Sequence, residues 1–296
     1  VRADVLEQLV AATQHAAERG AHAHHAAAHR VRVVAVVEAG HALHVRLAEP
    51  GGLGHGHDGL GRQPALLLLR EPQRVDALLG ALRAAITIPF TVKTRIGFDD
   101  PRVFDELLPI FARHSLDLLT VHARTVLEMY RSEVHYDYIA RAVAAMPCPV
   151  LANGNVHSAA KAAEVLRLTG ARGLMIGRGA IRNPWLFTQI RQQQRGEPLF
   201  VPRGRDVLGY IRALYEAICS PDVRESAQVQ KMKKYLNFVG LGVDAEGQFL
   251  HQIRRVSTRT EFFAVCETFL DHDRAMPLEP FPLNLKPTDF LAGEHL

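Results

Sequence analysis

Short apolar runs alternate with amphipathic segments from about residue 64 onward, and this alternation constrains the fold more than any other feature. Strand-like runs cover 89–95 and 118–124, and two further runs end at Asn153 and just before Gly177. Helices are expected at 76–85, 103–114, 136–145 and 158–170. This order predicts parallel strands joined by right-handed crossovers. We therefore expect an α/β fold, a (β/α)8 TIM-type barrel whose first third is incomplete or atypical. A doubly wound sheet is the alternative, but the glycine-rich opening motif typical of that fold is missing.

Polar residues or glycine follow the end of each of these four strands. In chain order they are Lys93 and Arg95, His122 and Arg124, Asn153 and Asn155, and Gly177 and Arg178. Because the carboxyl ends of barrel strands meet at one mouth, these residues are predicted to form a common site. The backbone N–H groups after Gly177 and the guanidinium of Arg178 are suited to holding a phosphate.

Each of these residues also has a simpler interpretation. Lys93 lies within an otherwise apolar strand, where its ammonium group needs an anionic or electron-rich partner. If a flavin were that partner, a cation beside its ring would stabilise the reduced, anionic form of the flavin. The alternative is a barrel lysine paired with a carboxylate. His122 either contacts a ligand or is a structural hydrogen-bonding group. Gly154, between two asparagines, permits close approach of a ligand, although Asn-Gly alone indicates only a turn.

The first part of the chain has an unusual composition. Residues 1–85 contain no Ile, Lys, Phe, Tyr, Trp, Met, Asn, Ser or Cys, and nine of the sixteen histidines fall within the first 60 positions. The stretch 21–29 is rich in histidine, but no carboxylate or cysteine stands at a ligand spacing, so we expect no metal site. Before about residue 62, a helical pattern at 5–19 and a strand-like run at 31–37 are the elements indicated. We treat residues 1–62 as an atypical segment and 63–202 as the barrel portion.

After residue 202 the alternation ends and helical patterns follow one another. They cover 206–219, 225–240, 246–255 and 260–271, which predicts a helical domain over 203–296. In the second helix an apolar stripe faces away from Lys231 and Lys234. This basic face is a candidate binding surface for a polyanion, and the alternative is an ordinary solvated face.

Bulk properties narrow the class of protein further. The formal net charge is +4, which is compatible with a nucleic-acid partner without requiring one. No apolar run is long enough to span a membrane. Three scattered cysteines form neither a disulfide framework nor a zinc site. We expect a cytoplasmic monomer with no membrane association.

Five segments between about residues 64 and 270 form a specific combination: TVKTRIGFDD, TVHARTVLEMYRSEVHYDYI, PVLANGNVHS, GLMIGRGAIRNPWLF and QKMKKYLNFVGLG. Together they resemble the tRNA-dihydrouridine synthases. Members of that family are FMN-dependent (β/α)8-barrel reductases with a C-terminal helical tRNA-binding domain. The resemblance implies that NADPH reduces FMN, which then reduces a uridine in tRNA.

The resemblance also assigns residues. It implies FMN binding by Lys93, His122, Asn153, Gly154, Asn155, Gly177 and Arg178, the last two at the phosphate. Arg124 matches a rim arginine facing the substrate, and Lys231 and Lys234 lie on the basic helix that would bind tRNA. Asn155 departs from the family pattern, since many members have Asp at that position.

No catalytic residue is identified, because the general acid of the family is missing. That acid is a cysteine in an Asn-x-Gly-Cys-Pro loop before the lysine strand, and this chain has no cysteine before Cys148. The family's first-strand Pro-Met-Ala motif and second-strand glutamine are also absent. A frame error upstream of residue 61 and a divergent member both explain these losses. If the given sequence is the real polypeptide, we expect impaired flavin retention and little or no uridine reduction. Two other functions stay open: a catalytically silent tRNA-binding remnant, and an FMN barrel enzyme acting on a free pyrimidine.

Overall fold

A computed structural model describes residues 32–36, 44–48, 67–129 and 133–281. By its internal contacts the chain divides into two compact units. We call residues 1–155 with 164–175 the first unit, and residues 156–163 with 176–296 the second unit. The predicted helix at 5–19 and the histidine-rich stretch at 21–29 lie outside the described residues.

The first unit is built on one sheet of six strands in the order β2-β1-β3-β4-β5-β6. The strands are β1 (Arg32–Val36), β2 (His44–Ala48), β3 (Phe90–Arg95), β4 (Leu118–His122), β5 (Val150–Asn153) and β6 (Gly173–Met175). β2 pairs antiparallel with β1, and all other neighbouring strands pair in parallel. The parallel pairing predicted from the sequence is confirmed, and the strand predicted at 31–37 is present as β1.

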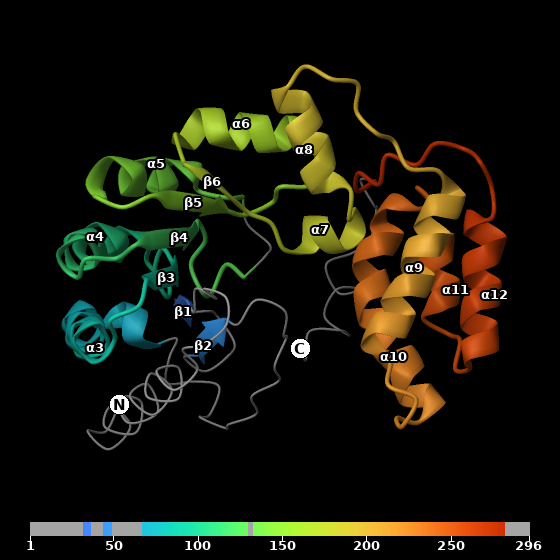
Figure 1. The fold of residues 1–296 in the computed structure, drawn as a ribbon, viewed down its shortest axis with the longest axis horizontal. Helices are drawn as coiled ribbons and strands as arrows, with labels where there is room; N and C mark the ends of the chain where they lie inside the picture. Colours follow the sequence, from blue (N-terminus) through green and yellow to red (C-terminus); the bar gives the residue numbers. More distant parts are fainter. Residues whose placement is uncertain (1–31, 37–43, 49–66, 130–132, 282–296) are drawn as a thin grey trace, which may run out of the picture. The chain divides into compact units, whose positions relative to one another are not determined.

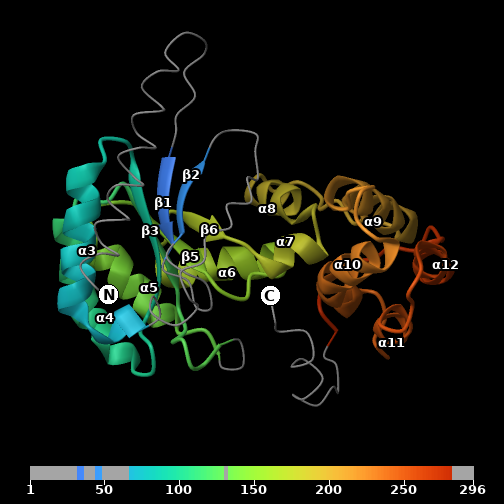
Figure 2. The same ribbon diagram turned by 90° about the horizontal axis from the view of Figure 1, so that it is seen from below.

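Helices connect the parallel strands, as a β/α crossover pattern requires. They are α3 (Pro72–Ala85), α4 (Phe104–Arg113), α5 (Tyr136–Ala145) and α6 (Ala159–Thr169), with short 3₁₀ turns η1 (Leu68–Arg70) and η2 (Pro101–Val103). Figures 1 and 2 show α3, α4 and α5 along one side of the sheet. In the described part the strands form an open sheet with β2 and β6 at its edges. This is the parallel α/β arrangement expected for part of a (β/α)8 barrel.

The two faces of the central strands differ sharply in chemistry. Phe90 and Val92 of β3, and Leu119 and Val121 of β4, are almost fully buried. They alternate along the strands with Lys93, Arg95, Thr120 and His122, which therefore occupy the opposite face. One face thus provides the apolar contacts with the helices, and the other carries polar side chains that are also buried.

The second unit consists of helices. They are α7 (Arg178–Arg182), α8 (Leu186–Gln194), α9 (Gly204–Ile218), α10 (Glu225–Val239), η3 (Gly240–Gly242), α11 (Gln248–Ile253) and α12 (Arg259–Leu270). The four helices predicted after residue 202 are confirmed as α9 to α12. The start of α12 is fixed by a capping box, in which the Thr258 hydroxyl accepts from Glu261 N–H and the Glu261 carboxylate accepts from Thr258 N–H.

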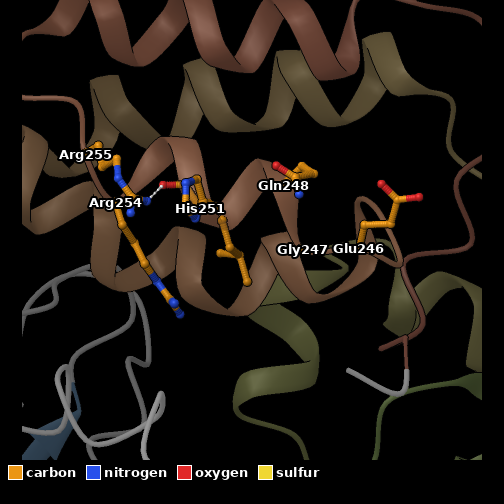
Figure 3. Close-up of a pocket in the computed structure, with 7 residues that line it drawn as sticks. Glu246, Gly247, Gln248, His251, Arg254 and Arg255 are labelled. Carbon is orange, nitrogen blue, oxygen red and sulfur yellow. Dashed lines mark hydrogen bonds between the residues drawn. The ribbon is translucent and has the colours of Figure 1, made fainter. Parts of the chain in front are cut away.

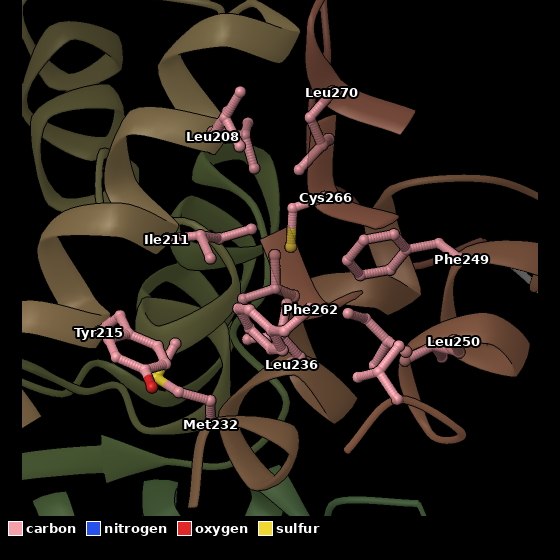
Figure 4. Packing of buried hydrophobic residues seen from close by; sticks show 14 of the residues in the cluster. Leu208, Ile211, Tyr215, Met232, Leu236, Phe249, Leu250, Phe262, Cys266 and Leu270 are labelled. Atoms are coloured by element: carbon pink, nitrogen blue, oxygen red, sulfur yellow. The ribbon is translucent and has the colours of Figure 1, made fainter. Parts of the chain in front are cut away.

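An apolar core holds α9 to α12 together (Figure 4). Val229, Met232, Leu236 and Val239 form the buried stripe of α10, and each is completely inaccessible to solvent. Lys231 and Lys234 are exposed on the same helix, as the predicted amphipathic pattern requires. No helix in the described ranges is long and apolar enough to cross a membrane.

Candidate functional site

The carboxyl ends of β3, β4 and β5 bring three of the predicted site residues onto one face of the sheet. His122 pairs in register with Arg95 on one side and with Asn153 on the other. Lys93 lies two residues before Arg95 and therefore on the same face. Lys93 and His122 are 7% and 6% exposed, so both side chains lie almost entirely in the interior.

The turn after β5 has a backbone shape that few residues tolerate. Gly154 has φ +141°, and a methyl group built on it would lie 2.9 Å from Cγ1 of Val134. Asn155 follows with φ +48°, a left-handed conformation. The Asn153 amide donates a 2.8 Å hydrogen bond to the carbonyl of Met175 in β6. Glycine is therefore required at 154, because its backbone conformation and the close packing of Val134 both exclude a side chain.

Arg124 lies just beyond the end of β4, and its side chain is the largest of those that are fully buried. Nη1 of Arg124 donates to Oδ1 of Asn155 at 3.4 Å. The Arg124 side chain therefore contacts the turn after β5. The role of Arg124 in facing the substrate, expected from the family resemblance, stays a prediction.

Tyr136 is a residue of this region that sequence reasoning did not identify. Its hydroxyl donates a 2.9 Å hydrogen bond to the carbonyl oxygen of Gly154. Burial raises the pKa of Tyr136, and the positive charge of Arg124 partly opposes that rise. The contact joins residues 18 positions apart. The helical pattern at 136–145 predicts the helix that carries Tyr136 but gives no sign of this bond.

Side-chain hydrogen bonds fix the residues that follow β4. Nη1 of Arg95 donates to the carbonyl oxygens of Thr125 and Met129, at 2.8 Å and 3.3 Å. The Glu128 carboxylate accepts from Thr125 N–H and pairs with Nε2 of His135, both at 2.6 Å. Burial, the largest single influence, raises the pKa of Glu128, but the hydrogen bonds with His135 and Thr125 and the charge of His135 together outweigh it, and the pKa lies below its usual range.

In the second unit, Gly177 and Arg178 lie at the start of α7. Gly177 is exposed, and a methyl group built on it would meet no other atom within 4 Å. Gly179 differs, because a methyl group there would collide with the carbonyl oxygen of Val156. The α7 backbone therefore packs closely against residue 156 while open space remains beside Gly177.

Arg182 is the last residue of α7, and its guanidinium has a buried hydrogen-bond donor. Its Nε donates a 3.1 Å hydrogen bond to the carbonyl oxygen of Phe238. Its Nη1 is buried and has no hydrogen-bond partner within the described ranges. Burial, with a contribution from the charge of Arg178, lowers the pKa of Arg182 to about 10. Such an orphaned buried donor is costly and is expected to have a partner in the functional state.

The predicted tRNA-facing lysines lie on the exposed side of α10. Nζ of Lys231 donates to the carbonyl oxygen of Ile218 at 2.5 Å. Lys233, between them, donates to the carbonyl oxygen of Arg254 at 3.1 Å, and burial lowers its pKa. Arg254 also borders a pocket of about 520 Å³ on α11 (Figure 3). In that pocket Arg255 donates to the carbonyl of His251.

In the part of the chain that the structure describes, no three His, Cys, Asp or Glu residues are grouped so that they could hold a metal ion. Cys148 lies two residues before β5, at the opposite end of that strand from Asn153. Its pKa is raised, chiefly by burial.

Comparisons with known proteins place this chain among its relatives. The family model described as dihydrouridine synthase matches residues 65–273. A probable tRNA-dihydrouridine synthase of Rickettsia prowazekii is 34% identical over 184 residues, which cover 62% of this chain and 56% of the relative. The tRNA-dihydrouridine(16) synthase of Neisseria meningitidis serogroup A is 28% identical over 205 residues, or 69% of this chain and 62% of the relative.

A third relative is more similar over a shorter stretch. The tRNA-dihydrouridine synthase B of Pseudomonas syringae pv. tomato is 42% identical over 124 residues, which cover 42% of this chain and 37% of the relative. The aligned regions thus span about half the length of the curated relatives. Because the family model covers more than half of this chain, and includes every predicted site residue, the chain belongs to the dihydrouridine synthase family.

Proposed function

We propose that this chain binds FMN at the carboxyl ends of its parallel strands and acts on uridine in tRNA, with NADPH as reductant. The observation that carries the proposal is that Lys93, His122 and Asn153 lie on one face of the sheet near its carboxyl edge, next to the glycine turn at 154, in a member of the dihydrouridine synthase family. One feature supports a fit to the phosphate of FMN. Arg182 has a buried Nη1 donor without a hydrogen-bond partner among the described residues, close to the charge of Arg178.

Each of these residues has a distinct part in that proposal. When bound, FMN supplies hydride transfer between the nicotinamide and the uracil ring. Lys93 brings a positive charge to the ring's N1–C2=O edge, and His122 and Asn153 provide hydrogen-bonding groups along the same face. Gly154 and Asn155 present backbone at close range. Gly177 and Arg178 are assigned to the phosphate, where backbone N–H groups and a guanidinium suit an anion.

The tRNA partner is assigned to the helical domain. Lys231 and Lys234 are exposed on α10 and suited to contact with phosphate groups. Chemistry on a uracil ring requires the base to leave its stack and enter the mouth of the barrel. A free pyrimidine would have no use for this basic surface, so we favour tRNA as substrate over a small molecule.

The proton for the uracil ring lacks an evident donor. The cysteine that the family resemblance implies has no counterpart before Cys148 in the sequence. Cys148 precedes β5, at the strand end opposite Asn153, so Cys148 does not replace the missing general-acid cysteine. The lack of this cysteine supports a second candidate function, in which the protein binds FMN and tRNA but reduces uridine slowly or not at all.

One experiment separates these functions. The purified chain is incubated with FMN, and flavin retention is read from its visible absorbance. It is then given NADPH and tRNA that lacks dihydrouridine, and dihydrouridine is measured by mass spectrometry. Retained flavin with dihydrouridine formation supports the synthase. Retained flavin and bound tRNA without product support the silent protein, and product from free uracil alone would point to the small-molecule enzyme. A chain that binds neither FMN nor tRNA would overturn the proposal.

A further inference from the structure

Tyr136 contacts the turn to which we assign flavin binding. It is the first residue of α5, and its phenol ring is half-buried. Its hydroxyl donates to the carbonyl oxygen of Gly154 at 2.9 Å, a distance typical of a well-formed hydrogen bond. A side chain from one β/α unit therefore holds the backbone of the next.

This hydrogen bond fixes more than one atom, because a peptide unit is planar. The carbonyl of Gly154 and the N–H of Asn155 belong to the same unit and point in opposite directions across a trans bond. Once the carbonyl is directed at Tyr136, the N–H of Asn155 is directed away from it. The orientation of the Asn155 N–H is thus set by the hydroxyl of Tyr136.

The turn needs such a restraint. Gly154 has wide conformational freedom, and Asn155 is in a left-handed conformation that costs energy for a non-glycine residue. Tyr136 is itself well placed to supply the restraint. The preceding residue, His135, donates its backbone N–H to the carbonyl of Ala123 at 2.9 Å. Val134 packs against Gly154 from the same segment.

We propose that Tyr136 is a positioning residue of the flavin site, which orients the Gly154–Asn155 peptide so that Asn155 N–H and its side chain present one fixed geometry to the cofactor. This inference rests on the proposed function, because it takes the turn after β5 as part of the flavin site. Arg124 contributes from the other side by donating to Oδ1 of Asn155.

The test is Tyr136→Phe, which removes only the hydroxyl. We expect the Kd for FMN to rise about three- to tenfold, the loss that corresponds to one net hydrogen bond. Riboflavin should lose affinity by the same factor, because the turn is not assigned to the phosphate. The visible absorbance bands of the bound flavin should also shift, since the groups beside the ring are altered.

The matched control is Tyr215→Phe. The Tyr215 hydroxyl donates to Oε1 of Gln228 at 2.9 Å, within the helical core of the second unit. Its removal deletes a comparable buried hydrogen bond and is expected to leave FMN affinity and the flavin spectrum unchanged. A loss of FMN affinity in both variants would identify a general stability effect and overturn the inference.

A double-mutant cycle with Asn155→Gly shows whether Tyr136 acts through the turn. Glycine accepts the left-handed conformation of residue 155 without strain but has no side chain to orient. If Tyr136 positions Asn155, Tyr136→Phe should raise the Kd less in the Asn155→Gly background than in the native one. Equal factors in both backgrounds, or native affinity in Tyr136→Phe, would overturn the inference while the proposed function stands. If the native chain retains no flavin, the proposed function itself fails.

Discussion

The Nε atom of Arg182 in α7 donates a hydrogen bond of 3.1 Å to the carbonyl oxygen of Phe238 in α10. The same guanidinium keeps a buried Nη1 for which the described part of the structure supplies no partner. The Arg182 side chain thus links two helices by a hydrogen bond and also buries a donor that has no acceptor among the described residues. The hydrogen bond stabilises the fold of the second unit, whereas the burial of the guanidinium charge destabilises it.

We expect Arg182→Met to change the stability of the cofactor-free protein by less than about 1 kcal/mol. The lost hydrogen bond is worth about that much, and removal of a poorly paired buried charge offsets it. Urea unfolding followed by circular dichroism measures the change. A loss several times larger would mean that Nη1 has a strong partner in the folded protein.

Arg95→Met should be far more costly, although the charge removed is the same. Nη1 of Arg95 donates to the buried carbonyl oxygen of Thr125 and to the partly buried carbonyl oxygen of Met129, so the substitution leaves both acceptors without this donor. We expect the free energy of unfolding to fall by about 2–3 kcal/mol, a typical cost when carbonyl oxygens in the interior lose a charged hydrogen-bond donor. The segment between β4 and α5 should also become cleavable by trypsin under native conditions. Unchanged resistance to trypsin would show that other contacts hold this segment.

Stability should fall in acid through Glu128. Its hydrogen bonds with His135 and Thr125 hold the pKa of the carboxyl below the ordinary 4.5, despite the opposing effect of burial. A depressed carboxyl pKa stabilises the fold above the ordinary value, and this stabilisation is lost as the pH falls through the folded-state pKa. In Glu128→Gln this contribution is absent at every pH. The difference in unfolding free energy between the native chain and Glu128→Gln should therefore shrink as the pH falls. A difference that is constant with pH would contradict this prediction.

Cys266 should report global unfolding. It is completely buried in the helical core, and burial raises its pKa to about 12 (Figure 4). Because the thiolate is the reactive form, iodoacetamide should label the partly exposed Cys148 and Cys219 in the native protein but Cys266 only on unfolding. Peptide mass spectrometry identifies the labelled positions. Rapid native labelling of Cys266 would show that the α9–α12 core opens locally.

Lys234→Ala should weaken tRNA binding and reduce its salt dependence. Removal of one phosphate contact lowers the slope of log affinity against log salt by about 1. Arg212→Ala is the control, because the Arg212 guanidinium is already paired with Glu267 at 2.7 Å. The FMN affinity should be unchanged in both variants. Equal slopes for the native chain and Lys234→Ala would exclude this lysine from the interface.

Local patterns predicted the elements well wherever the periodicity was uninterrupted. The helix at 136–145 has these limits in the structure, and the apolar stripe of α10 is buried as its spacing requires. The ends of elements were harder to predict. The strand predicted to reach residue 124 ends at His122, where Arg124 N–H turns back to the carbonyl of His122 at 2.7 Å. α3 starts at Pro72 rather than 76, because proline is well suited to the first turn of a helix.

Long-range side-chain contacts could not be predicted in this way. Strand order places His122 next to Asn153, so their proximity follows from a parallel sheet. No periodic pattern in the sequence predicts the hydrogen bond from Tyr136 to Gly154 or the one from Arg182 to Phe238. They depend on how separate segments pack, and hydrophobic patterns carry little information about that.

The strict alternation along β3 and β4 limits which insertions and deletions this lineage can accept. Every side chain in a strand changes face when the register moves by one residue. A single deletion within β4 would turn His122 toward the helices and direct Val121 toward Lys93 and Arg95. Changes of chain length are therefore expected to accumulate in the connections between strands and helices, outside the anchored stretch from Thr125 to Met129.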